Sequence, residues 1–163
     1  MALKFAEGDC GMVVSGPSYE NSRLGEMFSA YHVVTNENDF WYEFNKEPSF
    51  TNYWITDNYL TGNDTTLSMF FACPTTIYGF YIKNTHNAEG NDRGTKDFKI
   101  FSSDSEDGLW TEIISGSLPD ARNETDVPTQ SFTLNASVTT QYIRFQIESY
   151  YGLGGGLQYL AAY

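Results

Sequence analysis

Basic residues are scarce in this sequence, which has nine Lys and Arg against 21 Asp and Glu and a formal charge of −12. Nucleic acids and anionic lipid surfaces are bound by clustered basic side chains, and no run of Lys or Arg occurs here. We therefore expect no nucleic-acid partner, and the shortage of basic residues disfavours binding to membrane phospholipid. The excess of acidic residues suits neutral ligands, cationic ligands or bound calcium. It equally suits a charge that only keeps the domain soluble.

Residue types that carry catalytic chemistry are also few. The chain has two His and two Cys, Cys10 and Cys73, and it contains no Gly-x-Ser-x-Gly, no His-Glu-x-x-His and no zinc-ligand spacing. We therefore predict that it is not an enzyme. The two cysteines could pair in a secreted protein, or each could be a small buried apolar residue. We expect them to be unpaired, because nothing in the sequence brings them together.

Long apolar runs and helical patterns are missing as well. A membrane span needs about 18 consecutive apolar residues, and no stretch approaches that length. No window keeps the apolar spacing of a helix for more than two turns. The first residues lack the apolar core of a signal peptide, an observation that leaves the compartment open.

Aromatic residues are abundant, with 12 Phe, 12 Tyr and 3 Trp making up 17% of the chain. Such residues suit the half-buried, pleated surface of a sheet. Ile143, Phe145 and Ile147 alternate with polar residues, as a strand with one face on a core requires. Turn-rich segments separate the apolar runs. The patterns predict an all-β sandwich or jelly roll, with strands expected at 40–44, 66–71, 76–84, 97–103, 110–114, 130–134, 142–148 and 157–163.

Four stretches, taken in order, carry a family resemblance: 91–103 (NDRGTKDFKIFSS), 107–113 (DGLWTEI), 141–145 (QYIRF) and 155–163 (GGLQYLAAY). Together they resemble the discoidin domain, also called the coagulation factor V/VIII type C domain, and the related family 32 carbohydrate-binding modules. The clear match runs from about residue 53 to the end, and 1–35 match only loosely. The resemblance implies one domain over 1–163, with a galactose-binding-like jelly roll of about eight main strands. It also implies an extracellular or cell-surface location.

Members of this family bind galactosides and other glycans, phospholipid head groups or extracellular proteins through loops at one end of the sandwich. The resemblance therefore implies a lectin or carbohydrate-binding module for a neutral hexose such as galactose, with a glycan or glycoprotein as partner. The alternative is an extracellular adhesion or protein-interaction domain without a sugar site. The oligomeric state is left open.

Sugar binding requires polar groups for the hydroxyls and an aromatic face for the apolar side of the ring. The loop 84–93 joins two predicted strands and supplies the polar half, with candidate ligands His86, Asn87, Asn91 and Arg93. His86 could instead be a solvated loop residue, Arg93 could form a structural ion pair with Asp92 or Asp97, and the asparagines could be turn formers. The candidate aromatic residues are Tyr150, Tyr151 and Trp41, unless they belong to the core.

Relatives in the family often hold a structural calcium, and by position the resemblance makes Asn45, Glu47 and Thr51 the candidate ligands. Three departures weaken the match. An acidic residue common in the last strand is Gln158 here, the early Asp-Gly is replaced by 45–48 (NKEP), and the carboxyl end has no cysteine. We expect Arg144 to be structural, holding the loops from the outer face of the sheet.

Overall fold

The computed structural model describes residues 12–15, 34–36, 39–44, 54–55, 66–85, 91–124 and 126–163, with backbone pairing only for the strands before residue 66. All its regular elements are strands, which confirms the all-β prediction. No helix in these ranges is long and apolar enough to cross a membrane. The strands are β1 (Met12–Ser15), β2 (Val34–Asn36), β3 (Asp39–Phe44), β4 (Trp54–Ile55), β5 (Thr66–Lys83), β6 (Arg93–Thr95), β7 (Asp97–Ser103), β8 (Thr111–Ser117), β9 (Gln130–Ile147), β10 (Tyr150–Gly152), β11 (Gly156–Leu157) and β12 (Tyr159–Ala162).

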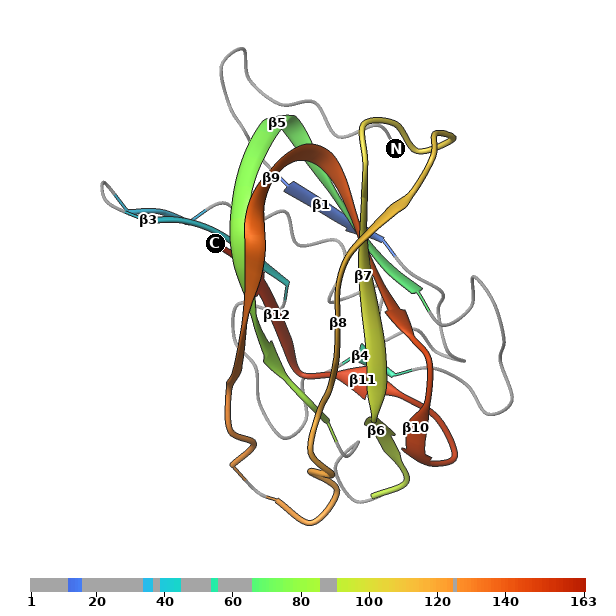
Figure 1. Cartoon of the computed structure of the whole chain (residues 1–163). Helices are drawn as coiled ribbons and strands as arrows, with labels where there is room; N and C mark the ends of the chain where they lie inside the picture. The colour runs from blue at the N-terminus through green and yellow to red at the C-terminus, as the bar shows by residue number, and fades with distance from the viewer. Residues whose placement is uncertain are drawn as a thin grey trace.

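Two strands of 18 residues, β5 and β9, connect the two layers of the sandwich. They pair antiparallel along their length, with a register shift between Phe70 and Thr75, and they arch over together in Figure 1. In one layer, the first half of β5 pairs with β1, the second half of β9 pairs with β7, and β7 pairs with β8. In the other layer, the second half of β5 pairs with β12, β12 pairs with β3, and β3 pairs with β2. One strand pair thus contributes to both layers.

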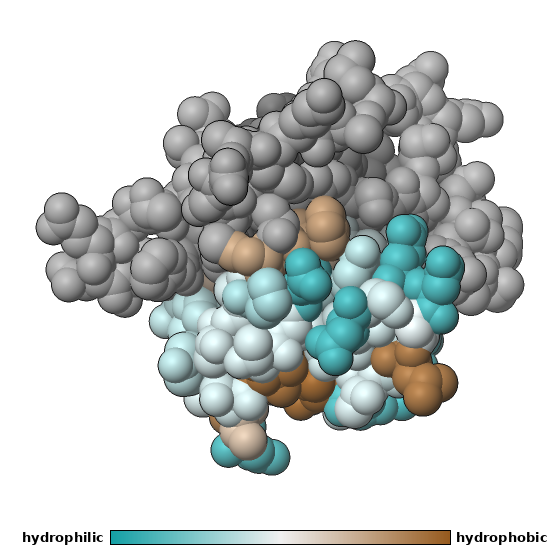
Figure 2. Space-filling view, turned by 90° about the horizontal axis from the view of Figure 1, so that it is seen from above, coloured by the Kyte–Doolittle hydropathy of each residue, from teal (hydrophilic) through white to brown (hydrophobic). Residues whose placement is uncertain are grey.

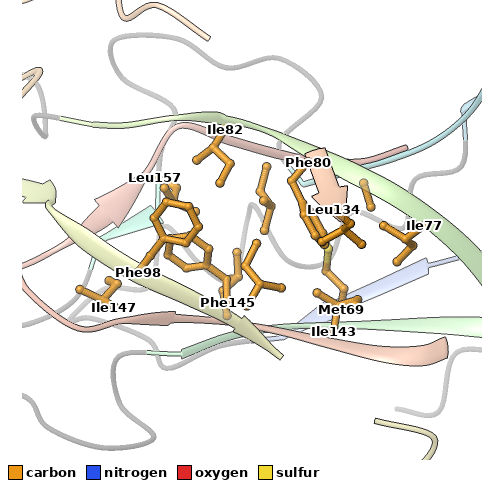
Figure 3. Close-up of a cluster of buried hydrophobic side chains, with 14 of the residues drawn as sticks. Met69, Ile77, Phe80, Ile82, Phe98, Leu134, Ile143, Phe145, Ile147 and Leu157 are labelled. Atoms are coloured by element: carbon orange, nitrogen blue, oxygen red, sulfur yellow. The ribbon is translucent and has the colours of Figure 1, made fainter. Parts of the chain in front are cut away.

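The core lies between these layers (Figure 3). The predicted alternation in β9 is confirmed, since Ile143 and Phe145 are fully buried and Ile147 nearly so. Phe98 of β7 stacks on Phe145 with ring centroids 5.2 Å apart and meets the edge of Phe132 at 4.9 Å. Each large side chain removed from water in this way stabilises the fold by about 1.5–3 kcal/mol.

Cys73 lies in the bend of β5 and is disulfide-bonded, so the expectation of an unpaired cysteine is wrong for this residue. The other cysteine of the chain, Cys10, lies outside the described residues. The sequence patterns predict no strand before residue 40. In the structure β1 pairs with β5, and Met12 lies opposite Phe71, two residues from Cys73. Strand pairing therefore brings the first residue of β1 close to this bend.

Candidate functional site

Two short strands, β6 and β10, pair at the lower end of the sandwich in Figure 1. Their pairing connects the predicted ligand loop 84–93 with the two predicted aromatic residues, Tyr150 and Tyr151. Strands β6 and β10 are antiparallel, with Tyr150 opposite Thr95 and Tyr151 opposite Gly94. Backbone hydrogen bonds extend this contact, from Leu153 N to the Asp92 carbonyl oxygen at 2.7 Å and from Gly94 N to that of Gly154 at 2.9 Å. We call this part of the molecule the loop end.

The buried side chain of Asn84, at the end of β5, braces the loop end from inside. Its Nδ2 donates to the carbonyl oxygens of Thr95 and Pro119 at 2.7 and 2.9 Å. Its Oδ1 accepts from the backbone N–H groups of Thr85 and Thr95 at 2.9 and 2.8 Å. The Thr95 hydroxyl then donates to the Gly156 carbonyl oxygen at 2.7 Å. These bonds fix the chain on both sides of the loop 84–93 and at the end of the loop that follows Tyr151, because buried polar groups are costly to leave unpaired.

A third loop, 118–124, completes the loop end. Asp120 accepts hydrogen bonds from Arg122 Nε and Nη2, at 2.9 and 2.8 Å, to its two carboxylate oxygens. This pairing holds the pKa of the Asp120 carboxyl below its usual value. The Arg122 guanidinium lies 5.8 Å from the ring centre of Tyr151. Asn91 Nδ2 donates to Asn123 Oδ1 at 3.1 Å. Side chains of the third loop thus contact side chains of both other loops.

The side chains differ in what they present to a ligand. Asn91 is exposed and has a φ of 50°, in the left-handed region that asparagine tolerates better than most residues. Tyr150 is 37% exposed. Tyr151 is partly buried, and its hydroxyl donates to the Leu118 carbonyl oxygen at 3.0 Å. Tyr150 is therefore the better candidate for an aromatic platform.

Arg93 is only 4% exposed and pairs with Asp92 through Nη1 and Oδ1, 2.7 Å apart. The turn that covers this region requires Gly152, whose φ is 77°. A Cβ at this position would lie 2.5 Å from the Asp92 carbonyl oxygen. The sequence suggested an ion pair of Arg93 with either Asp92 or Asp97, and the structure contains the pair with Asp92. Asp97 instead accepts hydrogen bonds from the hydroxyls of Ser117 and Ser149, which lower the pKa of its carboxyl.

The structure thus brings Asn91, Arg93, Tyr150 and Tyr151 to one end of the sandwich. His86, Asn87, the side chain of Trp41 and the predicted calcium ligands Asn45, Glu47 and Thr51 lie outside the described residues. Within the described ranges, no group of three or more His, Cys, Asp or Glu side chains could hold a metal ion. Sequence reasoning missed Asn84, Arg122 and Asn123 as parts of the site. The turn-rich composition of the third loop was the only available signal.

Comparison with solved structures identifies the fold. The family 32 carbohydrate-binding module of NanJ from Clostridium perfringens, in complex with galactose, superposes with a TM-score of 0.60. It is 14% identical over 93% of this chain and 92% of that chain. An F5/8 type C domain from Bacteroides fragilis gives a TM-score of 0.59 at 11% identity, over 80% of this chain and 94% of that one. The chain has the discoidin fold.

The same discoidin fold occurs as part of longer proteins. Two family 32 modules of ZmpB from Clostridium perfringens, in complex with GalNAc, match with a TM-score of 0.61 at 13% identity. This match covers 93% of the present chain but only 33% of that chain. No protein-family model matches the sequence, and no curated protein matches it. The prediction of a galactose-binding-like jelly roll is therefore confirmed by structural similarity.

Proposed function

We propose that this domain is a non-catalytic carbohydrate-binding module, or lectin, that binds a neutral hexose such as galactose at the loop end. The observation that carries the proposal is the β6–β10 pairing, which joins the polar loop of Asn91 and Arg93 to Tyr150. A hexose presents hydroxyl groups at its rim and an apolar face of C–H groups. Exposed amide groups and an exposed tyrosine at the same end of the sandwich suit both parts of such a ligand.

The role of each side chain follows from its position. The exposed amide of Asn91 would donate to and accept from sugar hydroxyls, with Asn123 beside it. Tyr150 would contact the apolar face of the ring. Arg93, buried and paired with Asp92, would orient the loop. His86 and Asn87 belong to the same loop and complete the proposed ligand set.

Structural relatives support this choice of ligand. The NanJ module is in complex with galactose, and the ZmpB modules are in complex with GalNAc, which is also a hexose. The same resemblance supports a secreted or cell-surface protein without catalytic activity of its own. A structural calcium held near Asn45, Glu47 and Thr51 is part of the proposal and is tested separately below.

The proposal is tested by a pair of matched substitutions. Asn91→Gly removes the amide but suits a φ of 50°, because glycine adopts positive φ without strain. We expect it to weaken galactose binding about tenfold, with an unchanged melting temperature. Tyr150→Ala should weaken binding similarly. Tyr78→Ala, which removes a tyrosine that is 58% exposed on β5, should not. Binding that survives both loop-end substitutions would contradict the site.

The ligand class is tested by a glycan array with calcium and with a chelator. Selective retention of terminal galactose or GalNAc supports a lectin, and loss of binding in the chelator supports the calcium site. A blank array under both conditions would overturn the sugar proposal and favour the adhesion or protein-interaction alternative. The thermal shift with millimolar galactose is a second readout, because a ligand that binds only the folded state raises its stability.

A further inference from the structure

A cavity of about 290 Å³ lies on the outer face of the sheet, beneath the hairpin that connects β7 and β8. This hairpin is at the opposite end of the sandwich from the loop end (Figure 1), and we call it the hairpin end. Figure 2 looks down on this end, where the described surface mixes hydrophilic residues with a few apolar ones. The cavity is lined by Ser68, Phe70, Glu106, Trp110, Tyr142 and Arg144, among others.

Strand register explains why these side chains meet. Ser68 lies directly opposite Arg144, and Phe70 directly opposite Tyr142, on adjacent strands of one face. The rings of Phe70 and Tyr142 are 4.9 Å apart and tilted by 35°, so they form an apolar wall. Trp110 meets Tyr142 edge-on, with ring centroids 6.4 Å apart. Cross-strand pairs of this kind hold one another in place.

Arg144 is the cationic group of the cavity. Its guanidinium lies 3.9 Å from the ring centre of Trp110, which fixes its plane. Its Nε is shielded from solvent and has no hydrogen-bond partner among the described residues. Burial lowers the pKa of this guanidinium, and the negative charge of Glu106 opposes the effect. A desolvated, under-paired arginine is stabilised by a carboxylate, whose two oxygens match its fork of N–H donors.

The other residues that line the cavity restrict the charge and the shape of the anion that can bind. Glu106 is exposed in the hairpin and repels negative charge, so a single carboxylate is tolerated better than a doubly charged phosphate. Glu106 and the hydroxyl of Ser68 can instead bind neutral hydroxyl groups of the same ligand. The Phe70–Tyr142 wall suits the apolar face of a ring, and a cavity of this size has room for about one sugar ring.

We propose that this cavity binds a hexuronic acid, with the carboxylate on Arg144 and the sugar ring against Phe70 and Tyr142. The site is separate from the loop end and adds an acidic sugar to the neutral hexose proposed there. A glycan that carries both kinds of residue could contact the domain at both ends.

The experiment is a titration of the intact domain followed by the NMR signal of the arginine Nε–H groups. Galacturonate should shift the Arg144 signal in a saturable manner, whereas galactose and the methyl ester of galacturonate, which lack the charge, should not. The signal is assigned by its loss in Arg144→Lys. This variant keeps the charge but loses the fork, and should bind galacturonate about tenfold more weakly, measured by calorimetry.

Two surface variants test the proposal even if the Arg144→Lys variant does not fold. Glu106→Gln removes the repulsion and should bind galacturonate about threefold more tightly. Glu124→Gln makes the same change of charge on the exposed surface of the loop end and should have no effect. Equal affinities for these two variants would overturn the proposal. So would equal shifts with the acid and its methyl ester, or acetate binding as tightly as galacturonate. Asn91→Gly should leave galacturonate binding unchanged, which separates this site from the first.

Discussion

Different interactions stabilise the loop end and the hairpin end of the sandwich. At the loop end, Asn84 and Thr95 link the loops through buried hydrogen bonds between neutral groups. At the hairpin end, Arg144 lies flat against Trp110, and Phe70 packs on Tyr142. The first arrangement depends on strict geometry and loses several bonds when one side chain is removed. The second relies on contact area and tolerates replacement by another large side chain.

The ends also differ in what they leave for a ligand. At the loop end, backbone groups of the loops satisfy the buried amide of Asn84, so that Asn91 and Tyr150 are presented on a rigid support. At the hairpin end, the buried Nε of Arg144 has no partner among the described residues. Pre-organised neutral side chains such as Asn91 and Tyr150 suit a neutral ligand, whereas an arginine with an unpaired N–H suits an anion. The comparison therefore supports two ligand classes for the two ends.

The largest effect is expected for Asn84→Ala at the loop end. The change removes four hydrogen bonds in a buried place and leaves the backbone groups of Thr95 without these partners. At about 1 kcal/mol for each bond, we expect a loss of about 4 kcal/mol in the free energy of unfolding. Urea denaturation followed by circular dichroism measures it.

Asn135→Ala is the control for this change, because Asn135 is exposed on β9 and its loss should change stability by less than about 0.5 kcal/mol. A loss below about 1 kcal/mol for Asn84→Ala would mean that water replaces the side chain, and the proposed bracing of the loops would then be wrong. The expected loss of galactose affinity in this variant is a second readout at the loop end.

A smaller effect is expected for Trp110→Leu at the hairpin end. The change removes the ring beneath Arg144 and the edge contact with Tyr142. We expect the free energy of unfolding to fall by about 2 kcal/mol, because both contacts are lost. The loss is no larger because water would then hydrate the Arg144 guanidinium. Trp110→Phe retains a ring and should lose about half as much. If both variants are as stable as the parent protein, the stack does not hold the hairpin end.

Patterns along the chain predicted six of the 12 described strands, β3, β5, β7, β8, β9 and β12, but not short strands such as β1, β6 and β10. Alternation predicted the inward side chains Ile143, Phe145 and Ile147 because each apolar residue lies two positions from the next. The patterns did not predict that 66–71 and 76–84 form one strand. Proline cannot donate to a sheet, so Cys73-Pro74 in the sequence predicts a strand end. The structure accommodates Pro74 at the register shift between Phe70 and Thr75, where the ladder is interrupted.

The candidate site was predicted only as far as local sequence allowed. Two loops with suitable residue types could be identified, each beside a predicted strand. Their contact depends on Tyr151 pairing with Gly94, and the third loop enters through the bond from Asn91 to Asn123, 32 residues away. No periodicity encodes such distant pairs. Arg122 and Asn123 thus have the composition of an ordinary turn, and only the fold brings them to the site.

The smallest expected effect is a pH dependence confined to the loop end. Arg122 lowers the pKa of Asp120, and the hydroxyls of Ser117 and Ser149 lower that of Asp97. Because each carboxyl is more acidic in the folded state, its stabilisation is fully present above the unfolded pKa, near 4. It disappears as the pH falls through the lower, folded pKa. The Asp120–Arg122 pair is about one-third exposed, so we expect it to contribute only a few tenths of a kcal/mol.

The measurement is amide hydrogen exchange between pH 6 and pH 3, corrected for the intrinsic rate. Protection at Leu118 and Ser149, whose N–H groups bond to the chain around Asp97, should fall with pH before protection in the arch of β5 and β9 does. Asp120→Asn cannot titrate and should reduce this pH dependence, whereas Asp107→Asn in the hairpin should not. Parallel loss of protection at both ends would instead indicate global unfolding. In that case the loop end is no more sensitive to acid than the hairpin end.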